Sequence, residues 1–84
     1  MYCEEVSLWR LRVLADADPC ALARVFERFL NLNVLPRRII AECGSNATVH
    51  VQVDVSGLQE EQVRTITAKI GQSPGIVNAY FHRI

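Results

Sequence analysis

The segment Thr48-Val-His-Val-Gln-Val-Asp-Val55 decides the fold, because valine occupies every second position in it. Successive side chains of a β-strand point to opposite faces, so this alternation predicts a strand with one apolar and one polar face. The polar face would carry Thr48, His50, Gln52 and Asp54. Gly44-Ser45-Asn46 comes just before the strand and has the residues of a hairpin turn. The strand is therefore expected to be the second arm of a hairpin.

The first arm of this hairpin is predicted from Pro36 to Cys43. Proline lacks a backbone N–H, so this strand should lie at a sheet edge or begin after the proline. An edge leaves N–H and C=O groups unpaired, and pairing with a second copy of the chain would satisfy them. We therefore expect a homodimer through this edge, with Ile39 and Ile40 in the pairing strand.

Upstream of the hairpin, the sequence predicts a strand followed by a helix. Val6 to Leu14 alternates as a strand, with one apolar face and one mixed face. The apolar face would carry Trp9, Leu11 and Val13, and the mixed face Leu8, Arg10 and Arg12. Asp18 suits a helix N-cap and Pro19 suits the first helical position, where no N–H is needed.

The helix that begins at Pro19 should run to about Leu32 and end at Asn33, which tolerates the left-handed conformation. Its apolar residues recur at spacings of three and four, which predicts one buried face. That face would hold Leu22, Val25, Phe26, Phe29 and Leu32.

Downstream, Ser56-Gly-Leu-Gln59 has the pattern of a capping box and predicts a second helix that Gly71 ends. This helix would bury Leu58, Val63, Ile66 and Ile70. Ser73-Pro74-Gly75 predicts a turn, and Ile76 to Ile84 a last strand. That strand would place Val77, Ala79 and Phe81 on one face and Asn78, Tyr80 and His82 on the other.

The predicted order is strand, helix, strand, strand, helix, strand, which is the ferredoxin-like βαββαβ arrangement of an α+β protein. Right-handed crossovers then place both helices on one face of a four-stranded antiparallel sheet. The first and third strands should be central and the Pro36 strand an edge. We expect one domain over residues 1–84, with its core from about residue 6 onward.

Composition argues against several classes of partner and location. Nine Lys and Arg residues balance nine Asp and Glu residues, so no net charge attracts nucleic acid or an anionic membrane. The three cysteines form no CxxC, Glu4 and Glu5 stand where a secretory signal would be basic, and no apolar run is long enough to span a bilayer. We therefore expect a soluble cytoplasmic protein that binds neither nucleic acid nor membrane.

Motifs that carry catalysis are absent: the sequence has no GxSxG, no phosphate-binding loop, no dinucleotide-binding glycine turn and no HExxH. A pair of Cys43 with His50 stays open, because such pairs form in space. His50 and His82 could share the open face of the sheet, but two imidazoles are too few for a zinc site. The same face lacks the stacking aromatics of RNA-binding sheets. We expect no enzyme activity, no cofactor and no metal.

The segment Ala15-Asp-Ala-Asp-Pro-Cys-Ala-Leu-Ala-Arg-Val25, followed by Phe29, resembles the ACT domain family of small regulatory modules that bind amino acids. Members resemble one another through an Asp/Pro turn that leads into a Leu-x-Arg-Val helix, with ββαβ to follow. The similarity extends from about residue 6 to residue 84. The short chain looks most like the small regulatory subunit of acetolactate synthase, an enzyme of branched-chain amino acid biosynthesis.

The resemblance implies a dimer with paired edge strands, an amino-acid effector at the seam and a larger catalytic partner subunit. By position in the family motif, the effector would contact Asp18, Cys20, Ala21, Leu22, Asn33 and Leu35. Cys20 stands where family members that bind amino acids usually have glycine, and its side chain occupies space that the ligand would use. A second interpretation therefore stays open, in which the chain is a protein–protein assembly module with no small ligand.

Overall fold

The computed structural model describes residues 8–84. Cys3 lies outside this range, and so does Val6, at which the first strand was predicted to begin. The elements are β1 (Leu8–Asp16), α1 (Pro19–Asn31), β2 (Arg38–Cys43), β3 (Thr48–Ser56), α2 (Glu60–Gly71) and β4 (Ile76–Arg83). Every predicted helix and strand is present, and each bound within the described residues lies within four residues of the predicted one.

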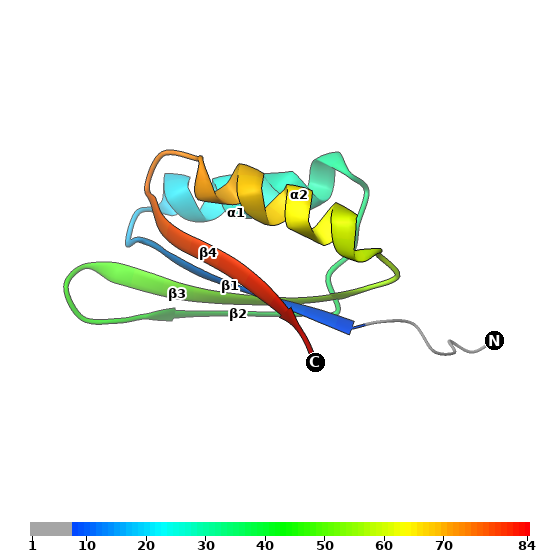
Figure 1. Cartoon of the computed structure of the whole chain (residues 1–84). Helices are drawn as coiled ribbons and strands as arrows, with labels where there is room; N and C mark the ends of the chain where they lie inside the picture. Colours follow the sequence, from blue (N-terminus) through cyan, green and yellow to red (C-terminus); the bar gives the residue numbers. More distant parts are fainter. Residues whose placement is uncertain (1–7) are drawn as a thin grey trace.

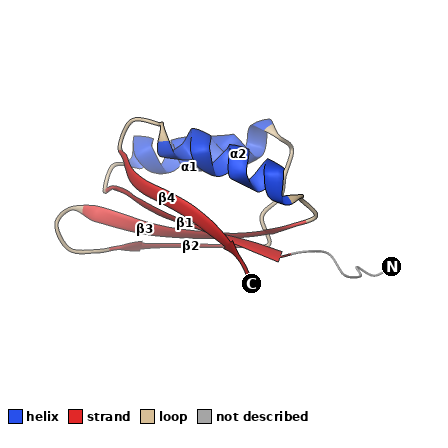
Figure 2. Ribbon diagram, viewed as in Figure 1, coloured by secondary structure: helices blue, strands red, loops and turns tan. Residues whose placement is uncertain are grey.

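The four strands form one antiparallel sheet in the order β2-β3-β1-β4. Both helices lie on the same face of this sheet, and the other face is open (Figures 1 and 2). The structure therefore confirms the predicted ferredoxin-like α+β arrangement. It also confirms that β1 and β3 are central and that β2, which begins two residues after Pro36, is an edge.

The core lies between the helices and the two central strands. In the register of β1 with β3, Leu11 pairs with Val53 and Val13 pairs with Val51, so the apolar faces of both strands meet the helices together. The buried apolar residues are Trp9, Leu11, Val13, Ala15, Ala21, Val25, Phe29, Val49, Val51, Val53, Val55, Val63, Ile66 and Ile70. The valine alternation thus places four consecutive inward side chains of β3 in the core.

Local hydrogen bonds begin and end α1 as predicted. The carboxylate of Asp18 accepts a bond of 3.0 Å from the N–H of Cys20, and Pro19 is the first helical residue. At the other end Asn33 is left-handed with φ 57°, and the N–H of Val34 donates to the carbonyl of Phe29 at 3.0 Å.

Leu32 was predicted to be buried on the inner face of α1, and this prediction was wrong. The helix ends at Asn31, so Leu32 is the C-cap and no longer follows the helical period. Its side chain is 55% exposed.

The capping box predicted at Ser56 and Gln59 was also wrong. Ser56 belongs to β3, and Gln59 is instead the N-cap of α2, where its N–H donates to Oε1 of Gln62 at 2.8 Å. Two features explain why α2 begins at Glu60 and not closer to Ser56. Gly57 has φ 83°, and the carbonyl of Leu58 accepts a bond of 3.0 Å from the indole of Trp9, which holds Leu58 outside the helix.

The turn before β4 packs tightly against the start of α1. Gly75 has φ 85°, and a Cβ added to it would lie 2.9 Å from the Cβ of Ala21, which is shorter than a normal carbon–carbon contact. The carbonyl of Gly75 accepts a bond of 2.8 Å from the N–H of Asp16. This position therefore requires glycine both for its backbone conformation and for its lack of a side chain.

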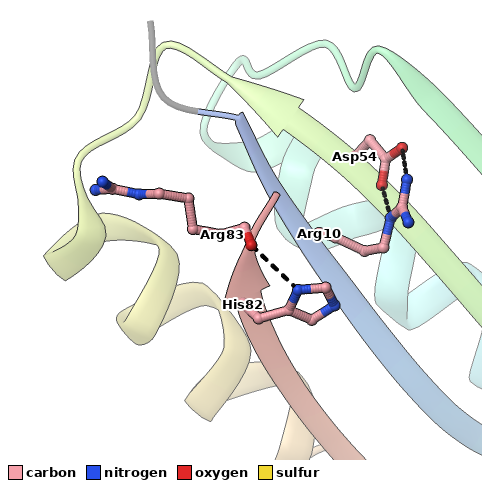
Figure 3. Close-up of polar contacts among 4 residues, drawn as sticks. All are labelled: Arg10, Asp54, His82 and Arg83. Atoms are coloured by element: carbon pink, nitrogen blue, oxygen red, sulfur yellow. Dashed lines mark hydrogen bonds and ion pairs between the residues drawn. The ribbon is translucent and has the colours of Figure 1, made fainter.

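On the open face an ion pair joins the two central strands. Arg10 donates to both carboxylate oxygens of Asp54, with distances of 2.9 and 3.0 Å (Figure 3). The hydrogen bond from Arg10 lowers the pKa of Asp54, and the charges of Arg10, Arg38 and Arg12 lower it further against the opposing effect of burial. The same hydrogen bond raises the pKa of Arg10.

We expect Gly75→Ala to destabilise the fold more than Gly57→Ala. Both positions have positive φ, which costs an L-residue about 1–2 kcal/mol. Only Gly75 meets a neighbour, and overpacking of this kind adds about 1–3 kcal/mol. Urea unfolding of the two variants measures the difference, and equal losses would show that the contact with Ala21 relaxes freely.

Replacement of Asp54 by asparagine should destabilise the protein at pH 7 and have little effect in acid. Because the pKa of Asp54 is lowered in the folded state, its carboxylate stabilises the fold above the unfolded-state pKa of about 3.9. That contribution is lost as pH falls through the lower folded-state pKa. Urea midpoints from pH 7 to pH 2 should therefore converge for the native chain and Asp54→Asn.

The control for this series is Glu42→Gln, which neutralises an exposed carboxylate on the same face. It should leave the midpoint unchanged at pH 7. A gap between native protein and Asp54→Asn that stays constant down to pH 2 would contradict the assignment.

Candidate functional site

Four of the predicted site residues lie together at the N-terminal end of α1, where helix N–H groups could hold a carboxylate. The chain already uses these N–H groups. Asp18 N–H donates to the carbonyl of Asp16 at 2.7 Å, and Cys20 N–H donates to the Asp18 carboxylate. Ala21 and Leu22 both donate to the carbonyl of Asp18, at 3.0 and 3.2 Å. A ligand at this end would have to replace bonds that α1 makes itself.

The side chains at this end of α1 differ in what they can reach. Ala21 is fully buried against Gly75, and Leu22 is half-buried beside the core. Asp18 and Cys20 are exposed. The surface that a ligand could contact here is therefore formed by these last two residues, with the Cys20 side chain occupying the position where the resemblance calls for glycine.

The other two predicted site residues lie at the far end of α1. Asn33 and Leu35 follow a helix of 13 residues, whose rise places them about 20 Å from Asp18. Leu35 is 89% exposed. Within one chain the structure does not bring the two halves of the predicted site together.

The edge strand β2 lies between these two ends and offers unpaired backbone groups. The N–H of Gly44 donates to the carbonyl of Thr48 at 2.8 Å, and in an antiparallel ladder such pairs recur at every second residue. The groups that point away from β3 are therefore those of Ile39, Ala41 and Cys43. The side chains of these three residues lie on the helix side of the sheet, and Ile39 is 44% exposed there.

Exposed leucines precede this edge along the chain. Leu30, Leu32 and Leu35 lie at the end of α1 and in the loop to β2, and each is more than half exposed. The exposure of Leu32 contradicts the prediction from sequence, which did not consider Leu30. The helical period alone places Leu30 off the buried face, whereas the exposure of Leu32 depends on where α1 ends. The surface from Leu30 to Ile39 therefore mixes exposed apolar side chains with those of Asn31, Asn33, Arg37 and Arg38.

A groove of about 500 Å³ lies between the end of α1 and the start of α2. Its apolar lining is formed by Leu32, Val34, Leu58 and Ile66, and its polar lining includes Arg28, Glu61 and Lys69. The sequence analysis did not identify this groove. Groups of both charges beside an apolar floor could hold a small zwitterion.

The register of β2 with β3 decides whether Cys43 can pair with His50, which the sequence left open. Glu42 lies opposite His50, so Cys43 projects to the other side of the sheet and cannot pair with that imidazole. His82 shares the open face, where its Nδ1 lies 3.3 Å from the carbonyl of Arg83 (Figure 3). Among residues 8–84, no three His, Cys, Asp or Glu side chains are grouped to hold a metal ion.

The helices α1 and α2 are also too short and too polar to cross a bilayer, and this holds for every helix in the described part of the chain.

No protein-family model matches the sequence, and no curated protein matches it. Solved structures do match the fold. The C-terminal domain of the MgtC protein from Mycobacterium tuberculosis has a TM-score of 0.79 at 14% identity, with 100% of this chain and 94% of that chain covered. The ACT domain of GTP pyrophosphokinase from Chlorobium tepidum has a TM-score of 0.78 at 9% identity, with 93% and 100% covered.

A homoserine dehydrogenase from Thiobacillus denitrificans contains a similar domain, with a TM-score of 0.75 at 16% identity. The match covers 94% of this chain but 17% of the dehydrogenase. At these identities the likeness concerns the fold alone. The fold of this chain is thus ACT-like: it is shared with the ACT domain of a GTP pyrophosphokinase and with a small part of a homoserine dehydrogenase.

Proposed function

We propose that this chain is a non-catalytic regulatory module of the ACT type, which pairs with a second copy through β2 and acts on a larger enzyme subunit. The observation that carries the proposal is the division of the candidate site. Asp18 and Cys20 lie at one end of α1, and Asn33 and Leu35 lie at the other. One chain cannot use both halves, whereas a symmetric dimer can.

The geometry of β2 supports this pairing. The N–H of Ala17 donates to the carbonyl of Ala47 at 2.9 Å, so the β2–β3 turn lies beside the start of α1. Antiparallel pairing of β2 with its copy brings the start of one strand next to the end of the other. Residues Asn33 and Leu35 of the second copy, just before its β2, would then approach the end of the domain that carries Asp18.

Pairing would also cover the surface that is exposed in the single chain. The unpaired N–H and C=O groups of Ile39, Ala41 and Cys43 would find partners, and the half-exposed side chain of Ile39 would enter the seam. A chain of 84 residues has a thin core, so this additional burial would stabilise it.

For the effector we propose a branched-chain amino acid, and for the partner the thiamine-diphosphate subunit of acetolactate synthase in the cytoplasm. This finer part rests on the resemblance of the Ala15–Val25 segment. At the seam, the exposed side chain of Leu35 from the second copy could contact the aliphatic side chain of the effector.

A second candidate function is assembly without a small ligand. Two observations favour it: the N–H groups from Asp18 to Leu22 are all bonded within the chain, and Cys20 occupies the glycine position. Under this alternative the β2 pairing remains and the amino-acid site does not form.

Ala41→Pro should convert a native dimer into a monomer. Its N–H points away from β3, so proline removes one bond across the seam and none within the sheet. The matched control is Ala41→Ser, which keeps the N–H and should stay dimeric. Sedimentation velocity measures the state of each, and a native chain that is monomeric at high micromolar concentration would refute the β2 pairing.

Calorimetric titration with valine, leucine and isoleucine separates the two candidate functions. Heat from the native dimer would support the sensor, and we expect Cys20→Gly to strengthen binding by removing a side chain from the site. No heat from the native chain but heat from Cys20→Gly would favour assembly. Cys20→Ser, which removes the thiol but keeps a side chain at this position, controls for loss of the thiol alone.

A further inference from the structure

No strand among residues 8–84 pairs with the outer side of β4, the second edge of the sheet, and the surroundings of β4 differ from those of β2. The N–H of Ile84 donates to the carbonyl of Leu8 at 2.9 Å, so the residues of β4 that bond β1 are the even-numbered ones. Ala79, Phe81 and Arg83 therefore direct their N–H and C=O groups away from the sheet. These groups form a row that an added strand could pair with.

Helix α2 runs along this edge (Figure 1). A groove lies between this helix and β4. The groove has a volume of about 410 Å³. Small residues line it, because Ala68 and Gly71 come from the helix and Ala79 from the strand, and a Cβ added to Gly71 would lie 3.9 Å from that of Ala79. Val77 also lines it and is 60% exposed. The side chains of an added strand could therefore enter beside α2.

Two guanidinium groups lie near the C-terminal end of β4, and that of Arg64 lines the groove. The guanidinium of Arg64 lies 5.6 Å from the ring centroid of Phe81, and that of Arg83 lies 4.7 Å from the ring of Trp9. Figure 3 shows the Arg83 side chain directed away from that of His82 on the open face. Within residues 8–84, the side chains that line the groove include no carboxylate. Glu60 pairs with Arg64, but both are largely exposed, so the pair is weak.

We propose that β4 and α2 bind an extended segment of another protein, which adds to the sheet as a fifth strand antiparallel to β4. Its alternate residues would be small and apolar to fit beside Ala68 and Ala79. An acidic residue would stand at its N-terminal end, beside Arg83 and Arg64. A second copy of this chain suits the edge less well, because antiparallel pairing would place the start of its β4, at Ile76 and Val77, beside these arginines and supply no carboxylate there.

This inference concerns the edge opposite to β2 and does not rest on the proposed regulatory function. Dimerisation at β2 and peptide binding at β4 can be tested separately, because each edge strand has an alanine whose N–H points away from the sheet. Ala79→Pro removes a bond at the peptide edge, and Ala41→Pro removes one at the edge proposed for dimerisation.

The direct test is fluorescence anisotropy with the labelled peptide acetyl-Glu-Thr-Val-Thr-Val-Thr-Val-amide and the full chain. We expect saturable binding that weakens at least tenfold when the glutamate of the peptide is replaced by lysine. Ala79→Pro should abolish binding, whereas Ala41→Pro should leave it within twofold of the native value.

A second pair of variants keeps the test valid if Ala79→Pro does not fold. Ala68→Leu fills the groove from an exposed position of α2, and Ala23→Leu makes the same change on α1. Leucine is nearly as good a helix former as alanine, so both should fold. We expect at least a tenfold loss of peptide affinity for Ala68→Leu alone.

Three outcomes would overturn the proposal. Absence of binding at millimolar peptide would do so, as would equal binding of the glutamate and lysine peptides. The third is a change in the oligomeric state of the peptide-free protein with Ala79→Pro but not with Ala41→Pro, which would make β4 an interface between copies.

Discussion

The antiparallel pairing of β1 with β3 in a single register is the constraint on which the rest of the structure depends. It aligns the inward residues of both strands beneath the helices, and a slip of either strand by one residue would turn the inward side chains of that strand to the open face. The same register fixes the open face, because it places Arg10 directly opposite Asp54. Core packing and the central ion pair therefore specify the same alignment from opposite sides of the sheet.

Because β1 and β3 are central, β2 and β4 must be edges, and the chain gives the two edges different surroundings. The helices leave the inner face of β2 exposed, and the segment from Leu30 to Ile39 that precedes it carries exposed leucines among exposed Asn and Arg side chains. The inner face of β4 is bordered by α2 and by the arginines at positions 64 and 83. The first surface suits a symmetric contact between copies, and the second suits a narrow segment with a negative charge.

Sequence reasoning predicted the features that depend on local patterns. The valine alternation, the left-handed Asn33 and the edge position of the Pro36 strand are each set by a few neighbouring residues. It failed where a contact between residues far apart in the sequence sets the structure. The start of α2 is an example, because the indole of Trp9 bonds the carbonyl of Leu58 and holds this residue outside the helix. The candidate site shows the same limit. Its residues were chosen by type and position, but the sequence does not show that α1 separates them by its full length or that Gly75 buries Ala21.

The positions of the two edges also determine what an assembly of this chain can do. A twofold axis at β2 would join two sheets of four strands into one, and each β4 would then become an outer edge. The two grooves would lie at opposite ends of the joined sheet, too far apart to compete for one extended segment. Such a dimer could hold two partner subunits, or two segments of one, and the second contact would form at high effective concentration. Dimerisation at β2 would thus strengthen binding at β4 without any contact between the two edges.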